Sequence, residues 1–499
     1  MLIKIASRKS DLARLQAYNV ARHLKKENSA IQVDHLFSAS FGDLNPDISL
    51  NAMPEKGAFT EDFKEGLKNR IFDLVVHSWK DLPTDLSPQS LIYTLKRADP
   101  RDLLLVRKDS IEQIKSTQKI NILTSSPRRV HHIKDFANDF IPMDIKEVLC
   151  HEVRGNIPTR LEKLIRGDGD ALIIAKAALD RLLVAAEDEF KDLKKNMRAM
   201  LNQCDFMLLP LTTFPTAAAQ GALAIEVHRE NAEVISILEK IHCSETYHHV
   251  KKERELLSSF GGGCHQKLGM TSFSHTNGEF FSASGVSQID NKMIKKLEFI
   301  DQASTQSNEK SELSHSFPNK NLKQSFFNRE RLSSKIPTDS DLYISKDYAL
   351  PSDYQSLQNI LWVSGLSSWK KLARKGYWIH GSSESLGEDF GLNIDTLIGR
   401  ETNWLKLTHD KSNISFHKKI LPTYKLTVNN IDQIEGHEDN FYWMSASQFK
   451  AAITKYPHIL EKNHSCGAGA SFKEISKHLK KGHLKIYLGY DQWYNSTVK

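Results

Sequence analysis

The chain has 499 residues and a net charge of +7, with 40% hydrophobic and 26% charged residues. This length exceeds what one hydrophobic core usually serves, so we expect three or four domains. The strongly apolar stretches, such as Ala171 to Leu179, are far shorter than the roughly 20 residues of a membrane helix. Charged residues occupy the N-terminal region where a secretory signal would be apolar. We therefore expect a cytoplasmic protein that does not span a membrane.

The cysteines are odd in number and include no C-x-x-C pair: they are Cys150, Cys204, Cys243, Cys264 and Cys466. This pattern argues against both a disulfide framework and a zinc site, so we expect no metal. Basic residues are interspersed with acidic ones and form no basic tail. Such a distribution favours local anion-binding sites over a nucleic-acid surface.

Short apolar runs alternate with helical patterns over residues 1–225, which is typical of an α/β fold. Parallel, doubly wound sheets are the expected arrangement of such units. The pattern predicts a helix at Asp11 to Lys26 and strands at Leu2 to Ala6, Ile71 to His77, Leu91 to Leu95, Leu103 to Val106, Ile120 to Thr124 and Ala171 to Ala175.

Residues 302–340 are polar and carry nine serines with few apolar residues, so we interpret them as a flexible linker. Apolar alternation resumes beyond them and predicts a separate C-terminal module. Two of its segments, WVSGLSSWKKL (362–372) and YWMSASQFKAA (442–452), read as a strand, small polar residues and then a helix. The strands predicted there are Ile360 to Val363, Tyr377 to His380, Phe441 to Met444 and Leu484 to Leu488.

The segment IFDLVVHSWKDLP (71–83) reads as a buried strand that ends close to Lys80 and Asp81. In open parallel sheets, ligands bind beyond the carboxyl ends of the strands, which is where Asp81 is expected. The alternative is a surface Lys–Asp pair at a strand end. Taken alone, the motif does not decide between these two readings.

Two further segments place basic residues at predicted helix starts. NILTSSPRRV (121–130) sets Ser126 at a helix start with Arg128 and Arg129 behind it, a suitable cradle for carboxylate or phosphate. The alternative is an N-cap serine with solvated arginines. VRGNIPTRLEKL (153–164) sets Arg154 before a helix that starts with proline and Arg160 within its first turns. Each arginine alone would be read as a surface residue, but several such clusters in one α/β unit indicate an anion site.

Three other segments have two readings each. Ser10, which follows Arg8 after the first strand, is either a helix N-cap or a ligand. The stretch 42–59 lacks periodicity and is typical of a mobile lid. Cys264 follows three glycines in SSFGGGCHQKLG (258–269). A lone cysteine is most often a buried hydrophobe, but adjacent glycines remove side chains around the sulfur and leave room for a bulky group.

These segments, in their order, resemble the hydroxymethylbilane synthase (porphobilinogen deaminase) family over residues 1–302. The motifs are ASRKSDLARLQA, KGAFTEDF, VVHSWKDLP, TSSPRR, RGNIPTRLEKL, AQGALAIE and GGGC. The resemblance implies an α/β fold with two periplasmic-binding-protein-like domains around a cleft, a small α+β cofactor-carrying domain and a C-terminal α/β module. The implied boundaries are 1–96 with 207–226 for domain 1, 97–206 for domain 2, 227–302 for domain 3, 303–340 for the linker and 341–499 for the module.

The resemblance also implies the roles of individual residues. Cys264 would hold a dipyrromethane cofactor through a thioether, and Asp81 would be the central catalytic carboxylate. Lys56 and Phe59 would belong to the loop over the cleft, and Gln220 to the hinge. The residues implied for binding the cofactor are Lys80, Ser126, Arg128 and Arg129, and those implied for binding the substrate are Arg8, Ser10, Arg154 and Arg160. The sequence has Ala219 where the family usually has glycine, and Lys267 where proline is common.

The activity implied is the head-to-tail condensation of four porphobilinogen molecules with release of ammonia, in tetrapyrrole biosynthesis. We expect a monomer whose partner is this small substrate, with no nucleic acid and no membrane. The alternative is a ligand-binding protein of the periplasmic type, which would explain a basic cleft but not Cys264. Residues 341–499 resemble uroporphyrinogen-III synthase in YWMSASQF followed by HSCGAGASFKEI. Because this region is shorter than the usual two-domain synthase, a second activity, an inactive module and a binding module all remain open.

Overall fold

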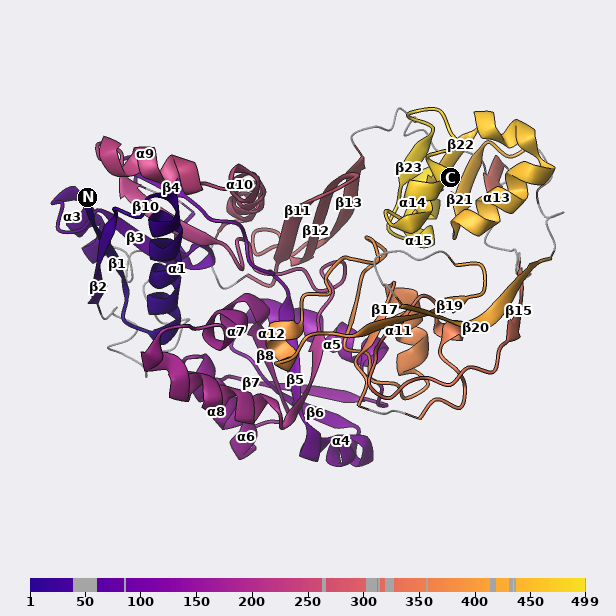
Figure 1. Ribbon diagram of the computed structural model, residues 1–499, viewed down its shortest axis with the longest axis horizontal. Helices are drawn as coiled ribbons and strands as arrows, with labels where there is room; N and C mark the ends of the chain where they lie inside the picture. Colours follow the sequence, from indigo (N-terminus) through magenta and orange to yellow (C-terminus); the bar gives the residue numbers. More distant parts are fainter. Residues whose placement is uncertain are drawn as a thin grey trace.

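The computed structural model describes residues 1–38, 61–84, 87–262, 266–301, 312, 315–318, 327–355, 358–412, 419–429, 434 and 437–498. Its strands form five sheets with helices packed against them, a mixed α/β architecture (Figure 1). Among the described residues, no helix is long and apolar enough to cross a membrane.

The first sheet has the strand order β2-β1-β3-β10-β4. Helix α1 covers it because Ala17, Val20 and Leu24 recur at helical spacing and are buried. The strands are β1 (Leu2–Arg8), β2 (Gln32–Ser38), β3 (Leu74–Ser78), β4 (Ser90–Tyr93) and β10 (Leu223–His228), and the helices are α1 (Asp11–Glu27), α3 (Glu61–Lys68), the 3-10 helix η2 (Trp79–Asp81) and α9 (Ala232–Ile241).

The second sheet has the order β7-β6-β8-β5-β9. Its strand β8 is buried along its whole length, as expected for a strand covered on both faces. The strands are β5 (Asp102–Arg107), β6 (Lys119–Leu123), β7 (Glu147–His151), β8 (Ala171–Ala175) and β9 (Cys204–Leu208). The helices are η3 (Lys108–Ser110), α4 (Ile111–Thr117), α5 (Pro127–Phe140), α6 (Ile157–Arg166), α7 (Lys176–Leu183), η4 (Asp188–Phe190) and α8 (Lys191–Leu201).

The expectation of purely parallel sheets is wrong for both of these sheets. Strand β10 runs antiparallel to β3 and β4, and strand β5 runs antiparallel to β8 and β9. The reason is the path of the chain, which crosses between the two sheets over residues 94–101 and again over 209–222. Each crossing leaves one sheet at the carboxyl ends of its parallel strands and enters the other sheet at the same side. The strand that follows must therefore run in the opposite direction.

The third sheet is an antiparallel meander, β11-β12-β13, packed against helix α10. It follows the second crossing and helix α9. Its elements are α10 (Ser244–Ser259), β11 (Gly269–His275), β12 (Gly278–Val286) and β13 (Met293–Asp301).

The C-terminal part contains two more sheets, the fourth with the order β15-β20-β19-β16-β17-β18 and the fifth with the order β14-β21-β22-β23. The fourth consists of β15 (Phe327–Arg331), β16 (Asp341–Ile344), η6 (Asp347–Ala349), β17 (Leu361–Val363), α11 (Leu366–Ala373), β18 (Gly381–Ser382), α12 (Asp395–Ile398), β19 (Trp404–His409) and β20 (Lys419–Val428). The fifth consists of β14 (Ser316–Phe317), β21 (Asn440–Trp443), α13 (Ala446–Lys455), η8 (Pro457–Glu461), β22 (Asn463–Cys466), α14 (Ala470–Ile475), β23 (Leu484–Ile486) and α15 (Tyr490–Thr497).

Both predicted strand–helix units of this part are confirmed, as β17 with α11 and β21 with α13. The strand predicted at Tyr377 to His380 is wrong, because the strand there is Gly381–Ser382. Gly381 permits this pairing, since a Cβ atom at that position would lie 2.2 Å from the Trp362 ring. Trp378, which precedes this strand, instead contacts the second sheet, where its indole N–H donates to the carbonyl of Phe206.

The region predicted as a linker, 303–340, contributes a strand to each C-terminal sheet. β14 pairs with β21, and β15 pairs with β20. Phe317 and Phe327 are its buried apolar residues, and each joins the core of the sheet that it borders. Polar neighbours do not prevent this pairing, because an edge strand can expose its other side chains to water. Residues 302–311, 313–314 and 319–326 lie outside the described residues.

Residues 315–498, which we call the tail, pack against the second and third sheets (Figure 1). The Trp369 ring is fully buried against Phe136 and Phe140 of α5, and its indole N–H donates to the Phe140 carbonyl at 3.0 Å. On the third sheet, Phe273 stacks on Phe390 with ring centroids 5.3 Å apart. The expected module behind a flexible linker is thus docked, because its apolar residues share cores with the N-terminal sheets.

Candidate functional site

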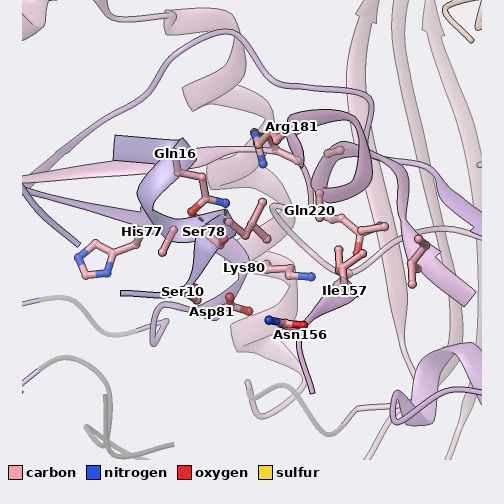
Figure 2. Close-up of a pocket in the computed structure, with 18 of the residues that line it drawn as sticks. Ser10, Gln16, His77, Ser78, Lys80, Asp81, Asn156, Ile157, Arg181 and Gln220 are labelled. Atoms are coloured by element: carbon pink, nitrogen blue, oxygen red, sulfur yellow. Dashed lines mark hydrogen bonds between the residues drawn. The ribbon is translucent and has the colours of Figure 1, made fainter. Parts of the chain in front are cut away.

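The carboxyl ends of several parallel strands open on one cavity of about 960 Å³ (Figure 2). It is lined by residues at or after the ends of β1, β3, β6, β7 and β8, by residues of α7 and of 217–222, and by Leu257, Gln266 and Leu268. This is the position at which ligands bind in open α/β sheets. Among the described residues, the cavity wall contains two aspartates, Asp11 and Asp81, and eight cations: Arg8, Lys9, Lys80, Arg128, Arg129, Arg154, Arg160 and Arg181.

Lys80 and Asp81 lie on the short helix η2, directly after strand β3. This turn brings Asp81 to the cavity as an exposed residue, with Lys80 beside it (Figure 2). Burial lowers the pKa of Lys80, and the nearby Asp81 carboxylate opposes that shift. The predicted strand end is confirmed, and the pair lies in a cavity and not on an open surface.

Ser126, Arg128 and Arg129 stand at the start of α5. The Ser126 hydroxyl accepts a hydrogen bond from the backbone N–H of Arg129 at 3.4 Å, so this serine caps the helix. The solvated-arginine alternative is wrong, because Arg128 and Arg129 are only 3% and 7% exposed. Both guanidiniums donate to the carboxylate of Asp102 at 2.7 Å.

Asp102, at the start of β5, is a functional candidate that the sequence analysis missed. Its buried carboxylate also accepts a hydrogen bond from the Gln220 amide at 2.9 Å. Burial would raise its pKa, but the charges of Arg128 and Arg129 hold that pKa well below its usual range. The sequence did contain one indication of this role, since Asp102 directly precedes the apolar run LLLV. A charge at the start of a buried strand needs partners of opposite charge or hydrogen-bond donors.

This arrangement leaves excess positive charge at the cavity wall. Two buried guanidiniums share one carboxylate, so a net positive charge remains. The Nε–H groups of Arg128 and Arg129 also have no hydrogen-bond partner among the described residues. Because these two nitrogens are shielded from solvent, it is the excess positive charge that suits the wall to a ligand that carries carboxylates.

Arg154 and Arg160 flank the start of α6, where Asn156 caps the helix by accepting from the Thr159 N–H at 3.0 Å. Arg154 pairs with Glu152 at 2.8 Å. Burial lowers the pKa of Arg160 to about 10, and the charges of Arg129 and Arg154 act in the same direction. Like charges gathered around Arg160 favour an anion between them.

Arg8 ends strand β1, and Ser10 occupies the N-cap position of α1. The Ser10 side chain makes no capping hydrogen bond. Both residues line the cavity. Of the two readings of Ser10, only the backbone position of a cap is observed, and the residue lies at the cavity near Asp81 (Figure 2).

Gln220 lies where the two chain crossings meet. Its side chain is buried and donates to the carbonyl of Pro100 at 2.7 Å as well as to Asp102. The flanking Ala219 and Gly221 have φ values of 64° and 88°, in the left-handed region. A Cβ atom at Gly221 would lie 2.5 Å from the Ala98 carbonyl oxygen, so glycine is required there. The left-handed conformation of Ala219 also explains why glycine is usual at that position in the resembling family.

Arg181 on α7 is a second cavity residue that the sequence analysis missed. It donates to the carbonyl of Gly221 at 2.7 Å, and burial lowers its pKa to about 10. Arg181 lies in an ordinary amphipathic helix, and nothing in the surrounding sequence indicates that it faces a cavity.

Cys264, Lys56 and Phe59 lie outside the described residues. Gln266, two positions after the cysteine, lines the cavity and donates to the carbonyls of Phe260 and Gly262 at 2.8 and 2.6 Å. The described ends of the glycine loop therefore border the same cavity as Asp81 and the arginines.

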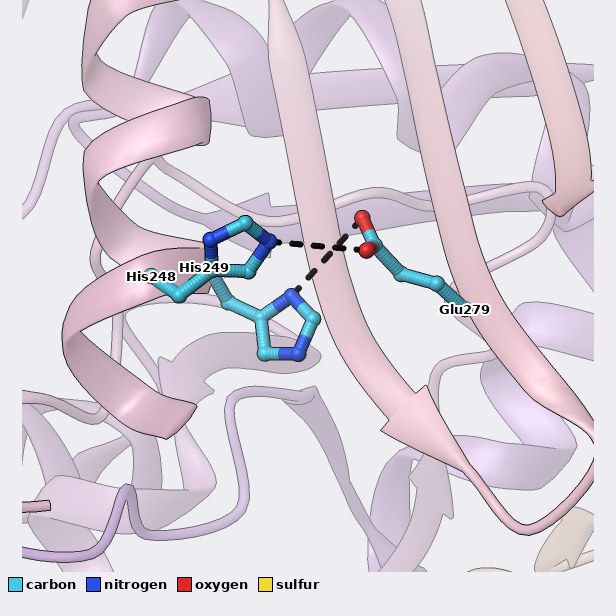
Figure 3. A group of neighbouring side chains, drawn as sticks. All are labelled: His248, His249 and Glu279. Atoms are coloured by element: carbon cyan, nitrogen blue, oxygen red, sulfur yellow. Dashed lines mark ion pairs between the residues drawn. The ribbon is translucent and has the colours of Figure 1, made fainter. Parts of the chain in front are cut away.

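One group of described side chains, away from this cavity, has the spacing of metal ligands: His248, His249 and Glu279 (Figure 3). Their polar atoms already have protein partners. Glu279 pairs with Lys252, and the two ring nitrogens of His249 each contact a serine hydroxyl, of Ser272 and Ser274, at 2.8 Å. These contacts account for the cluster without an ion, and the expectation of no metal stays a prediction.

Comparison with known proteins identifies the family. The family pattern described as "Porphobilinogen deaminase, dipyromethane cofactor binding domain" matches residues 3–236. Porphobilinogen deaminase of Nostoc sp. is 33% identical over 298 residues, which cover 59% of this chain and 84% of that protein. The chain belongs to the porphobilinogen deaminase family. The enzyme of Maridesulfovibrio salexigens is 34% identical over 265 residues, covering 52% of this chain and 77% of its own length.

Porphobilinogen deaminases of this pattern bind a dipyrromethane cofactor, and the cavity fits such a group. It offers eight cations among its described lining residues, at the carboxyl ends of the strands. Among solved structures, the BenM effector binding domain with its effector benzoate covers 52% of this chain and 93% of its own length. At 13% identity and a TM-score of 0.26, that likeness supports no conclusion.

The Asp102 pairing leads to a prediction about stability. Asp102→Ala leaves two buried guanidiniums without their counter-charge and should lower the free energy of unfolding by about 3–5 kcal/mol. Because the pKa of Asp102 is depressed in the folded state, its contribution should be full above about pH 4 and be lost as the pH falls through the folded pKa. Urea denaturation at several pH values measures both effects.

The control is Asp109→Ala, which removes an exposed partner of Arg107 and should leave the urea midpoint almost unchanged. Equal loss of stability in the two variants would contradict a special role of the Asp102 pairing.

Proposed function

We propose that the protein is a hydroxymethylbilane synthase. It condenses four porphobilinogen molecules head to tail, with release of ammonia, on a dipyrromethane that Cys264 holds through a thioether. The observation that carries the proposal is the cavity in which Asp81 stands among arginines, in a chain of the porphobilinogen deaminase family.

The charge of the substrate explains the number of cations. Each porphobilinogen ring carries an acetate and a propionate, so the negative charge grows with every ring that is added. A buried carboxylate without a partner costs several kcal/mol, and charge-assisted bonds to guanidiniums offset that cost. In this proposal the cofactor carboxylates are bound by Lys80, Ser126, Arg128 and Arg129, and the substrate carboxylates by Arg8, Ser10, Arg154 and Arg160.

Asp81 is suited to the chemical step. Loss of ammonia from porphobilinogen leaves positive charge at the pyrrole nitrogen, and a carboxylate beside that nitrogen stabilises the charge as it develops. The same carboxylate can accept a proton when the new bond is complete. Dipyrromethane, when bound, supplies the pyrrole carbon to which the first substrate is joined. The arginines hold each ring by its carboxylates, which provides the orientation that coupling requires.

The proposed domain arrangement follows from the two crossings. The first and second sheets act as two lobes of the periplasmic-binding-protein type, with Gln220 at their hinge and the cavity between them. The third sheet carries the cofactor cysteine, and Lys56 and Phe59 belong to a loop over the cleft. A ligand-binding protein without catalysis would use the same basic cavity, but it would leave the GGGC loop without a role.

Mass spectrometry tests the proposal directly. The purified wild type should carry an adduct of two pyrroles on the peptide that contains Cys264. Cys264→Ser should fold without the adduct and without activity, because an alkoxide is far harder to form than a thiolate at neutral pH. An adduct on Cys150, Cys204, Cys243 or Cys466 would contradict the assignment, and a wild type without any adduct would favour the ligand-binding alternative.

Asp81→Asn should keep the cofactor but lose most turnover. The amide preserves the shape of the side chain and lacks the charge that meets the developing cation. A loss of a few kcal/mol of transition-state stabilisation corresponds to roughly a hundredfold or more in kcat. Asp11→Asn is the matched control, because Asp11 lines the same cavity but pairs with Arg14 at 2.8 Å. Near-normal kcat in Asp81→Asn would remove this residue from the centre of the mechanism.

The tail is a candidate for a second activity, the closure of the linear product as in uroporphyrinogen-III synthase. The feature that favours it is the meeting of three loops after parallel strands β17, β18 and β22. The Ser385 N–H donates to the Ser364 carbonyl at 2.8 Å, and a Cβ atom at Gly469 would lie 3.1 Å from Gly387. Loops at such strand ends are where α/β sheets bind ligands.

Isomer analysis of the porphyrins decides this second candidate. The full-length protein given porphobilinogen should yield mainly the type III isomer, as resolved by chromatography after oxidation. Gly469→Val, which crowds the three-loop junction because a Cβ atom there would lie 3.1 Å from Gly387, should lower the type III fraction while the total tetrapyrrole stays the same. If the wild type yields only type I, the tail is not a synthase and has a binding or structural role.

A further inference from the structure

The tail inserts a buried carboxylate into the second crossing between the first and second sheets. Glu384 is 2% exposed, and its carboxylate accepts hydrogen bonds from the backbone N–H groups of Leu211 and Thr212 at 3.0 and 2.8 Å. It also accepts one from the Thr212 hydroxyl at 2.7 Å. Three donors on one carboxylate form a strong, directional contact. The conformation of residues 211–212 is therefore tied to the tail.

The loop that carries Glu384 holds an unusual backbone conformation. Glu384 and Ser385 have φ values of 52° and 63°, in a region that residues other than glycine seldom occupy. The conformation is held by hydrogen bonds from the Glu384 N–H to the Ser382 hydroxyl at 2.9 Å and from the Leu386 N–H to the Ser383 carbonyl at 2.8 Å. Strained residues persist where the surrounding structure over-determines them, and they cluster at functional sites.

A continuous set of contacts leads from Thr212 to the cavity. Residues 210–214 form a turn in which the Phe214 N–H donates to the Pro210 carbonyl at 2.8 Å. The ring centroid of Phe214 lies 5.8 Å from the Arg128 guanidinium carbon, and the Pro215 carbonyl accepts from Arg128 at 2.9 Å. Phe214 and Pro215 thus contact one side of the Arg128 guanidinium. Asp102 binds its other side.

The same segment also holds the third sheet. The Met270 N–H donates to the Thr216 carbonyl at 2.7 Å, and the two threonine hydroxyls of Thr216 and Thr271 lie 2.9 Å apart. Strand β11 can approach this closely because residue 269 is glycine, where a Cβ atom would lie 2.2 Å from the Pro215 carbonyl oxygen. A shift at residues 211–212 would therefore move both a cleft arginine and the strand that follows the cysteine loop.

We propose that Glu384 is a positioning residue, through which the tail sets Arg128 for binding the carboxylates of the cofactor, the anchor on which the pyrrole chain grows. The proposal rests on the function proposed above. Glu384 touches no substrate, and it acts through residues 211–215. Displacement of a binding group by about 1 Å can reduce a rate on the order of a hundredfold, so a modest shift of this segment is sufficient.

The test follows enzyme-bound intermediates in the full-length holoenzyme. Wild type, Glu384→Ala, Glu384→Gln and Arg128→Ala receive limiting porphobilinogen, and intact mass measures how many rings each molecule carries. Glu384→Ala should accumulate chains of the same length as Arg128→Ala and turn over roughly ten- to a hundredfold more slowly per folded molecule. Glu384→Gln should show the same pattern more weakly, because the amide oxygen still accepts hydrogen bonds but the amide nitrogen faces donors.

Two further variants separate positioning from general stability. Arg198→Ala removes contacts with the carbonyls of Thr396 and Leu397 on another part of the tail interface and should leave the intermediate pattern as in wild type. Thr212→Val removes only the hydroxyl bond to Glu384. If Glu384→Ala does not fold, Thr212→Val carries the test and should accumulate the same intermediates as Arg128→Ala.

The outcomes distinguish this inference from the function on which it rests. If the wild type shows no series of masses that differ by one pyrrole ring, the proposed function fails, and the positioning role fails with it. If the wild type shows the series and Glu384→Ala, or Thr212→Val in its place, shows it unchanged in pattern and rate, the positioning role alone is wrong. A pattern in Arg198→Ala equal to that of Glu384→Ala would also overturn it, since any weakening of the tail interface would then suffice.

Discussion

The pairing of Asp102 with Arg128 and Arg129 is the interaction on which the candidate site depends. A buried carboxylate is costly without partners, and here two guanidiniums and the Gln220 amide satisfy it. The same bonds fix where the two cations stand. Because Asp102 begins strand β5 immediately after the first crossing and Gln220 ends the second, one anion joins both crossings to the start of helix α5. The positions of these two cleft cations, Arg128 and Arg129, thus follow from a single desolvated charge.

The tail changes what surrounds this site. The apolar clusters of the second and third sheets include tail residues, whereas the described clusters of the first sheet include none. The tail therefore packs mainly against the second and third sheets (Figure 1), and the core that it shares with the second sheet also contains Leu15 of helix α1. Shared cores also mean that the tail is part of the folded unit, since removing it would expose residues of α5 such as Phe136 and Phe140.

Much of the site could be predicted from the sequence where a charged residue directly follows a predicted strand or begins a predicted helix. Asp81 after a buried strand and Arg128 at a capped helix start follow from local rules, since parallel strands bring their carboxyl ends to one edge. Asp102 and Arg181 could not be predicted in the same way, because their roles depend on partners distant in sequence. The polar composition of 303–340 suggested a linker, but a single phenylalanine in each of two short strands was enough to pair them with the C-terminal sheets.

The sequence by itself determined the family, the α/β character and the main candidate residues, because ordered motifs and local periodicity are carried by neighbours along the chain. Only the tertiary structure decided the antiparallel strands β5 and β10, the docking of the tail and the contact of Glu384 with residues 211–212. These features depend on which surfaces meet after the chain has crossed twice between two sheets. Burial then decides the outcome, because apolar side chains such as Trp369 and charges such as Asp102 are stable only where the fold supplies their distant partners.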